Sequence, residues 1–254
     1  MFNKISFYTF VRREFERFLR VPIQTLVSPW ISALLYIFIF GYVIGQRIQF
    51  FENIDYIDFV LPGVLMMNII FGAFGQSSSS LYFQRFSRAI EEILTAPLSY
   101  TEMILGYVIG AVIRSLAVGA GVYVIALLFT EANMDHAVLF FFYVVIVAVI
   151  FSLLGLLVAL WSEKFEHLSV LQTFVITPLI YIGGVFNSIS MLPEQLQIFT
   201  RLNPFFYMVD GLRYSMISYS ESNLAGGVVF LILLALILFF WVFRLFHKGY
   251  KLRT

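Results

Sequence analysis

The chain has 254 residues, of which 61% are hydrophobic and 12% charged, and it contains 30 Phe and 14 Tyr. Soluble domains average about 45–50% apolar and about 25% charged residues, so this composition indicates an integral membrane protein. A net charge of +1 argues against nucleic acid as a partner. Zero cysteines exclude disulfides, and three scattered histidines give no metal-ligand spacing, so we expect no bound metal.

The N-terminal segment, residues 1–22, predicts an amphipathic helix in the cytoplasmic membrane interface. Its apolar side chains, from Phe7 to Leu19, fall on one helical face and its arginines on the other. Glu14 is the one misfit in this pattern, and Pro22 is expected to turn the chain inward. The alternative is a basic flank that only follows the positive-inside rule.

The rest of the chain predicts an all-α membrane domain, a single domain over residues 1–254, with six transmembrane helices. A helix needs about 20 apolar residues to cross the hydrocarbon core. The stretches that meet this length run over about 23–44, 56–75, 103–129, 137–161, 168–188 and 224–243. The first is longer than the apolar part of a cleavable signal peptide, so we expect it to remain as an anchor.

The distribution of Lys and Arg predicts the orientation. These residues gather in the N-terminal segment, the 76–102 loop, the 162–167 loop and the C-terminal tail. Because positively charged short loops stay in the cytoplasm, both termini are predicted to be cytoplasmic. The segment 183–214 then faces outward.

Several chemistries lack their signatures. No phosphate-binding loop of the form G-x-x-x-x-G-K-[ST] occurs, so we expect no catalytic residues and no ATP bound by this chain. The deep parts of the spans contain no Asp, Glu or His, which weakens the hypothesis of an ion-coupled carrier.

Arg114 lies near the middle of the third span, where a charge costs at least about 2.5–3.5 kcal/mol. We expect it to face protein or water. Either it clamps helix carbonyls or Gln172 of another span, or it contacts a polar substrate group. Gly106 and Gly110 of the same span form a small-xxx-small pair, which permits close approach of another helix.

The sequence of the 76–102 loop predicts a short helix, a break in the chain after it, and then the start of the third span. Apolar residues recur at helical spacing from Phe83 to Leu94, and Pro97 ends that helix. Ser99-x-x-Glu102 matches a capping box that would begin the third span. Such a loop suits the transmission of a push from a soluble partner, and the alternative is a surface helix that only covers the lipid boundary.

The outer segment, residues 190–218, predicts two short helices. Pro193 suits the first turn of one, Asn203 can cap the next, and Pro204 fits that helix's first position. Asp210 and Arg213 share the polar side of the second helix and can pair. From the residues alone, these re-entrant-like helices fit either a plain amphipathic loop or an outer gate.

The order of several motifs resembles a known family. The motifs are Pro62-Gly63, Glu91-Glu92-Ile-Leu-Thr-Ala-Pro97, Gly183-Gly184-Val185-Phe186, Leu192-Pro193, Leu202-Asn203-Pro204 and Asp210-Gly211-Leu212-Arg213. On these motifs the chain resembles the permease subunit of a type-2 ABC exporter, the group that includes bacterial drug, lipid and polysaccharide exporters.

The resemblance implies a homodimer in the bacterial inner membrane that grips two copies of a separate ATP-binding subunit, which holds ATP and Mg²⁺. It implies an ATPase-coupling region and an outer gate, and the substrate would be an amphipathic, drug-like, lipid or glycan molecule that moves outward. The coupling residues would be Arg88, Glu91, Glu92, Leu94 and Pro97, and the gate residues Pro193, Asn203, Pro204, Asp210 and Arg213.

Two other functions compete with this one. The first is an ion-coupled secondary carrier or channel, and the second is a membrane scaffold that binds a partner without transport. The scarcity of acids within the spans argues against the first. The helix-break-restart pattern of the 76–102 loop argues against the second.

Overall fold

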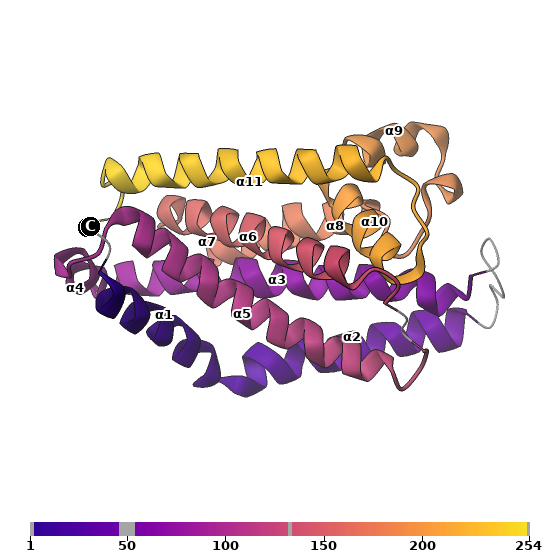
Figure 1. The fold of residues 1–254 in the computed structure, drawn as a ribbon, viewed down its shortest axis with the longest axis horizontal. Helices are drawn as coiled ribbons and strands as arrows, with labels where there is room; N and C mark the ends of the chain where they lie inside the picture. The colour runs from indigo at the N-terminus through magenta and orange to yellow at the C-terminus, as the bar shows by residue number, and fades with distance from the viewer. Residues whose placement is uncertain (1–2, 46–53, 132–133, 253–254) are drawn as a thin grey trace.

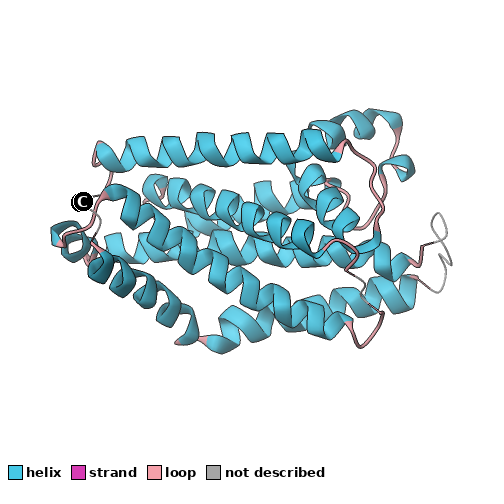
Figure 2. Ribbon diagram, in the orientation of Figure 1, coloured by secondary structure: helices cyan, strands magenta, loops and turns pink. Residues whose placement is uncertain are grey.

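A computed structural model describes residues 3–45, 54–131 and 134–252, and these residues form helices joined by short loops, without a strand (Figure 2). The predicted all-α membrane fold is therefore confirmed. The long helices lie along one common axis (Figure 1). Helices α1 and α4 lie at one end with the C-terminus, and α9 and α10 lie at the other.

The helix bounds, in chain order, are as follows. They are α1 Lys4–Leu19, α2 Ser28–Tyr36, α3 Tyr56–Phe86, α4 Ile90–Thr95, α5 Tyr100–Ala126, α6 Ala137–Trp161, α7 Glu166–Leu171, α8 Thr177–Ile182, α9 Glu194–Leu202, α10 Pro204–Ile217 and α11 Leu224–His247. π-Helical stretches, Ile23–Val27 and Ile37–Ile44, flank α2, and another, Gln172–Ile176, joins α7 to α8.

Within the described residues, 5 helices are long and apolar enough to cross a membrane. They are Ile23–Gly41, α3, α5, α6 and α11. The expected fifth span corresponds to the shorter apolar helix Glu166–Ile182. The count of six spans therefore stays a prediction, and five of the six segments reach the required length.

Helix α3 is the centre of the bundle, and most of its side chains are buried against α5, α6 and α10. It has 31 residues and continues to Phe86, whereas the expected span ends at about residue 75. The polar residues beyond 75 can lie in this packed helix because their hydroxyls find partners within it: Ser77 Oγ donates to the carbonyl of Ala73, and Ser79 Oγ to that of Gly75.

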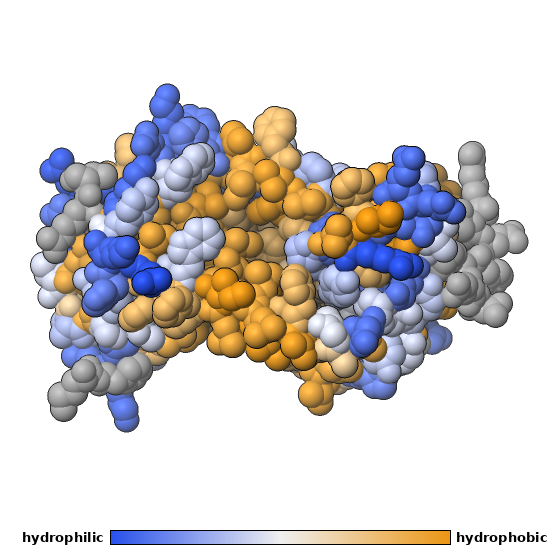
Figure 3. Space-filling view, turned by 90° about the horizontal axis from the view of Figure 1, so that it is seen from above, coloured by the Kyte–Doolittle hydropathy of each residue, from blue (hydrophilic) through white to orange (hydrophobic). Residues whose placement is uncertain are grey.

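The outer surface suits a bilayer. Seen from above, apolar side chains form a band across the middle of the molecule, and hydrophilic ones gather at both ends (Figure 3). On α11, Leu236 is 60% exposed and Trp241 56% exposed. Such large exposed apolar surfaces are unfavourable in water and favourable in lipid.

Candidate functional site

Helix α4 presents two acidic side chains away from the bundle. Ile90 and Ile93 are 2% and 4% exposed and pack into the core, whereas Glu91 and Glu92 are exposed. Because α4 is only one and a half turns long, its buried isoleucines fix which side faces outward. The other predicted coupling residues lie beside it, with Arg88 and Pro97 exposed and Leu94 half-buried.

The chain turns sharply between α3 and α4, although the apolar spacing predicts one helix from Phe83 to Leu94. α3 ends at Phe86, and Arg88 adopts a left-handed backbone with φ of 60° before α4 begins at Ile90. A left-handed residue cannot continue a right-handed helix, so it redirects the chain. α4 thereby becomes a separate unit between α3 and α5.

The loop after α4 is tied to two helices. Ser99 and Glu102 form the predicted capping box at the start of α5, which confirms that prediction. The same Glu102 carboxylate accepts a hydrogen bond from the Asn3 backbone N–H, at 2.8 Å, just before α1. The starts of α1 and α5 are therefore joined directly beside α4.

Glu14, the misfit of the amphipathic pattern, is fully buried and joins α1 to α3. Its Oε2 accepts from Ser80 Oγ at 2.6 Å, and its Oε1 accepts from Gln84 Nε2 at 2.9 Å. Tyr107 of α5 donates in turn to Gln84 Oε1 at 2.5 Å. This polar junction connects three helices near α4.

A groove of glycines on α5 receives α1. A Cβ atom at Gly106 would lie 2.3 Å from the Phe10 ring, and one at Gly110 would lie 2.7 Å from the Glu14 Cβ. No side chain fits at these separations, so both positions require glycine or a displaced α1. The small-xxx-small pair thus permits the packing of α1 against α5.

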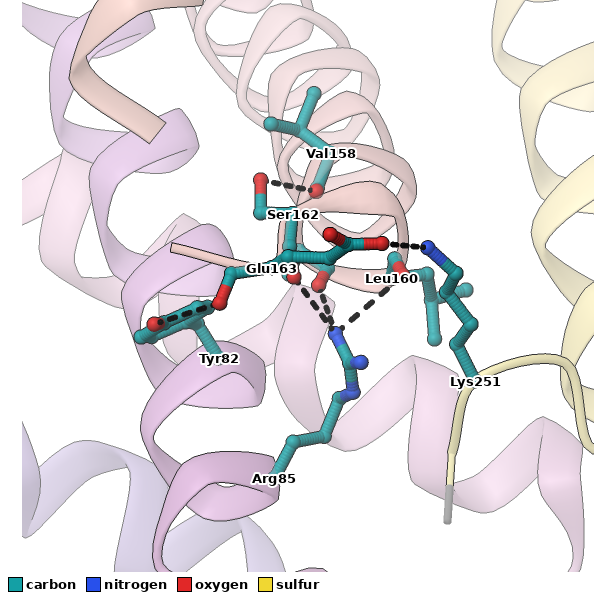
Figure 4. A network of polar contacts seen from close by, with 8 residues as sticks. Tyr82, Arg85, Val158, Leu160, Ser162, Glu163 and Lys251 are labelled. Carbon is teal, nitrogen blue, oxygen red and sulfur yellow. Dashed lines mark hydrogen bonds and ion pairs between the residues drawn. The ribbon is translucent and has the colours of Figure 1, made fainter. Parts of the chain in front are cut away.

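Arg85 binds the C-terminal end of α6 (Figure 4). Its side chain donates to the carbonyl oxygens of Ala159, Leu160 and Ser162. The last carbonyls of a helix lack intrahelical donors and carry partial negative charge, so a buried guanidinium is favourable there. Arg85 therefore holds the ends of α3 and α6 together.

The C-terminal tail joins this contact through an ion pair. Lys251 Nζ lies 3.0 Å from Glu163 Oε1, and its hydrogen bond lowers the pKa of the Glu163 carboxyl (Figure 4). Tyr82 of α3 donates to the Glu163 backbone carbonyl. The tail thus contacts the same end of α6 as Arg85.

Arg114 contacts α3 rather than the span that contains Gln172. Its NH1 donates to Gln76 Oε1 at 3.3 Å, and its Nε has no partner among the described residues. Gln76 in turn donates to the Glu14 backbone carbonyl at 3.3 Å. Arg114 therefore extends the α1–α3–α5 junction, and of the expected partners neither Gln172 nor a helix carbonyl binds it in the described part of the chain.

At the other end of the molecule, Arg213 of α10 is fully buried. Its Nε donates to the Phe59 carbonyl at 3.1 Å and its NH2 to the Gly184 carbonyl at 2.6 Å. The guanidinium also lies 3.8 Å from the centroid of the Phe59 ring. This one side chain joins α10, α3 and the Gly183–Phe186 loop.

Asp210 faces a different partner, so the predicted Asp210–Arg213 ion pair does not form in the described part of the chain. Its carboxylate accepts hydrogen bonds from Ser220 Oγ, from the backbone N–H groups of Glu221 and Ser222, and from Ser222 Oγ. Hydrogen bonds to an ionised carboxylate are strong, and these donors satisfy Asp210, while Arg213 donates to the carbonyls of Phe59 and Gly184. Asp210 thereby fixes the loop that leads into α11.

The outer motifs come together around α3. A Cβ at Gly63 would lie 2.6 Å from the Val185 carbonyl oxygen, so Pro62-Gly63 lets the Gly183–Phe186 loop pack on α3. Asn203 caps α10, with Pro204 in the first turn, and its side chain also donates to the Leu179 carbonyl at 2.6 Å. Pro193 precedes α9 directly. These gate candidates lie at one end of the bundle, opposite α4 (Figure 1).

Sequence reasoning missed the structural roles of Glu14, Arg85 and Glu221. Glu221 accepts hydrogen bonds from Ser188 Oγ and the Ile189 N–H in the outer loops. A carboxylate on the apolar face of α1 was the available signal for Glu14. Arg85 gave no signal, because it is one of several polar residues of the predicted surface helix, and Glu221 gave none, because it lies in a short polar segment.

Comparison with known proteins identifies a family. The family model described as ABC-2 type transporter matches residues 5–217. The chain is 39% identical over 244 residues to the inner membrane transport permease YadH of Escherichia coli, covering 95% of this chain and 94% of the relative. It is 23% identical to nodulation protein J of Bradyrhizobium diazoefficiens, over 93% of this chain and 91% of that protein.

Proposed function

Because the chain belongs to the ABC-2 type transporter family, we propose that this transport permease is the membrane subunit of an ATP-driven exporter. A separate ATP-binding subunit hydrolyses ATP with Mg²⁺, and the permease forms the path through the inner membrane. Two permease copies and two ATPase copies make up the complex. The 39% identical relative, an inner membrane transport permease, supports an inner-membrane location. The distribution of Lys and Arg supports a cytoplasmic position of both termini.

The observation that carries the proposal is the position of α4. It is short, exposed on its acidic side, and anchored on its apolar side by Ile90 and Ile93. A soluble partner that contacts Glu91 and Glu92 therefore pushes on a rigid unit, since the buried isoleucines resist its rotation. Residues Arg88 to Pro97 are the ATPase contact.

The movement of α4 reaches the membrane helices through polar and steric contacts. α4 follows α3 directly, and the α3 end is bonded to α1 by Glu14 and to α6 by Arg85. The loop after α4 is bonded to Asn3 through Glu102. A displacement of α4 therefore moves four helices together rather than one.

At the opposite end, α9 and α10 form the outer gate. α9 exposes Ile198, Phe199 and Leu202, which are 64%, 66% and 77% exposed, so its apolar side is free to contact lipid, substrate or the second permease copy. α10 is held to α3 through Arg213. The substrate is an amphipathic molecule of drug-like, lipid or glycan class, and the apolar character of the described spans favours a substrate with an apolar part.

Co-purification with the ATPase tests the coupling assignment. Glu92→Ala combined with Pro97→Gly should lower ATPase binding at least tenfold and abolish stimulation of its hydrolysis by the permease, with the fold intact. Glu194→Ala, an exposed acid on α9 at the other end, is the matched control and should bind the ATPase normally. Equal ATPase binding by both variants would show that α4 is not the contact.

A further inference from the structure

Two arginines of α1 and the arginine that follows its last residue line one cleft. Arg13, Arg17 and Arg20 follow the i, i+4, i+7 spacing and so share one side of the helix. They border a cleft of about 260 Å³ whose other wall is the end of α3. That wall is formed by Phe83, Gln84 and Ser87.

Three positive charges line this cleft, and the Glu14 carboxylate, which interacts with Arg17 and Arg13 at longer range, offsets only part of them. Among residues 3–45, 54–131 and 134–252, none of the three guanidinium groups forms an ion pair. The nearby carboxylates are already engaged, since Glu16 pairs with Arg12 at 2.7 Å and Glu14 is buried with Ser80 and Gln84. Like charges held together repel, so an anion in the cleft lowers the energy of the site.

The cleft combines this charge with apolar surface. Arg17 lies 5.8 Å from the centroid of the Phe83 ring, which is 44% exposed. Val21, which follows Arg20 in the chain, is 50% exposed, and Ile23 at the start of the first span is 75% exposed. A ligand that fits carries an anionic head for the arginines and an apolar part for the adjoining surface.

The position of the cleft relative to the membrane indicates that such a ligand comes from the bilayer. Arg20 precedes the first membrane-spanning helix, which begins at Ile23, so the arginines lie where phospholipid headgroups lie. The cytoplasmic leaflet is rich in anionic lipid, and each Lys or Arg near its surface contributes about 1 kcal/mol of attraction. A lipid phosphate therefore meets this cleft without leaving the bilayer.

We propose that the cleft between α1 and the end of α3 binds the headgroup of an anionic phospholipid from the cytoplasmic leaflet. Gln84 lines the cleft and also bonds Glu14 and Tyr107, so the bound headgroup touches the junction of α1, α3 and α5. The lipid stabilises α1 in its groove on α5. This assignment depends on the predicted orientation and not on ATPase coupling.

Native mass spectrometry of the purified, delipidated protein tests the site with added phosphatidylglycerol and phosphatidylcholine. The wild type should retain phosphatidylglycerol in preference. Removal of each arginine should weaken that binding roughly five-fold, the equivalent of about 1 kcal/mol, so Arg13→Gln/Arg17→Gln/Arg20→Gln should lose it almost completely. Arg12→Gln, which removes the same charge from the same helix outside the cleft, should retain it.

Further arms separate the alternatives. Arg13→Lys/Arg17→Lys/Arg20→Lys keeps the charge and should keep a clear preference for phosphatidylglycerol. If the triple Gln variant is unstable, the single variants Arg13→Gln and Arg20→Gln, at exposed positions, should each show the roughly five-fold loss. Equal loss in Arg12→Gln, no preference over phosphatidylcholine, or complete displacement of the lipid by inorganic phosphate would overturn the proposal.

Discussion

Replacement of Glu14 tests whether the polar junction holds α1 in place. The carboxylate accepts from Ser80 Oγ at 2.6 Å and from Gln84 Nε2 at 2.9 Å, and it is 0% exposed. Glu14→Ala removes both acceptors and leaves a small cavity. Glu14→Gln keeps the shape and one acceptor oxygen, so the two variants separate packing from charge.

The magnitude follows from what each donor retains. Gln84 Nε2 keeps a second hydrogen bond to Ser80 Oγ at 3.0 Å, and the Ser80 hydroxyl can turn to a carbonyl of its own helix. Glu14→Ala therefore loses about one satisfied buried donor plus the packing of the side chain, about 2–3 kcal/mol in total. Glu14→Gln should lose about 1 kcal/mol.

The pH dependence provides a second readout. Burial raises the pKa of the Glu14 carboxyl, although the hydrogen bond from Ser80 and the charge of Arg17 oppose the rise. The folded state then binds a proton more readily than the unfolded state. Stability from this group is therefore complete below the unfolded pKa and is lost as pH rises through the raised folded pKa. Glu14→Gln does not titrate and should lack this decline.

Thermal unfolding in detergent across this pH range, with hydrogen exchange of α1, measures both effects. Glu16→Ala is the matched control, because Glu16 lies on the exposed side of the same helix and pairs with Arg12. That exposed pair should contribute no more than about 1 kcal/mol. Equal destabilisation by Glu14→Ala and Glu16→Ala, or the same pH slope in Glu14→Gln and wild type, would refute the reasoning.

Three other predictions use the remaining contacts. Gly110→Ala places a methyl group 2.7 Å from the facing glutamate of α1 and should destabilise by about 1–3 kcal/mol in thermal unfolding, whereas Gly226→Ala, with 3.7 Å to its nearest neighbour, should not. Asp210→Ala frees four donors in the loop before α11 and should raise protease cleavage of that loop while ATPase binding is unchanged; protection equal to wild type would contradict its role. Since the chain has 0 cysteines, Gln195→Cys should react with an impermeant reagent added outside intact cells and Arg88→Cys should not, and the reverse pattern would invert the topology.

Structural features that depend only on neighbouring residues could be predicted from the sequence. Asn203 and Pro204 determine the start of α10 because capping involves only adjacent residues. The capping box at Ser99 and Glu102 is local in the same way. The all-α class followed from apolar stretches long enough to span a bilayer.

Structural features that depend on residues far away in the sequence could not be predicted. The spacing of Asp210 and Arg213 permits a pair, but the structure gives each of them partners from other segments, 59 and 184 for the arginine and 220–222 for the aspartate. The serines after residue 75 suggested a loop, yet burial lets them bond within α3. Sequence spacing shows which residues share a face and does not show what the fold places opposite that face.

The length of α3 gives it the geometry of a lever. At about 1.5 Å per residue its 31 residues extend about 46 Å, well beyond a hydrocarbon core of about 30 Å. The part of α3 nearest α10 is fixed where Gly63 meets Val185 and Arg213 binds Phe59. From Gly63 to Phe86 helix α3 is about 35 Å long, so a tilt of about 5° about the contact at Gly63 displaces the end beside α4 by about 3 Å. A small rotation of α3 about the fixed contacts near α10 and a displacement of a few ångströms at its end beside α4 are thus the same motion.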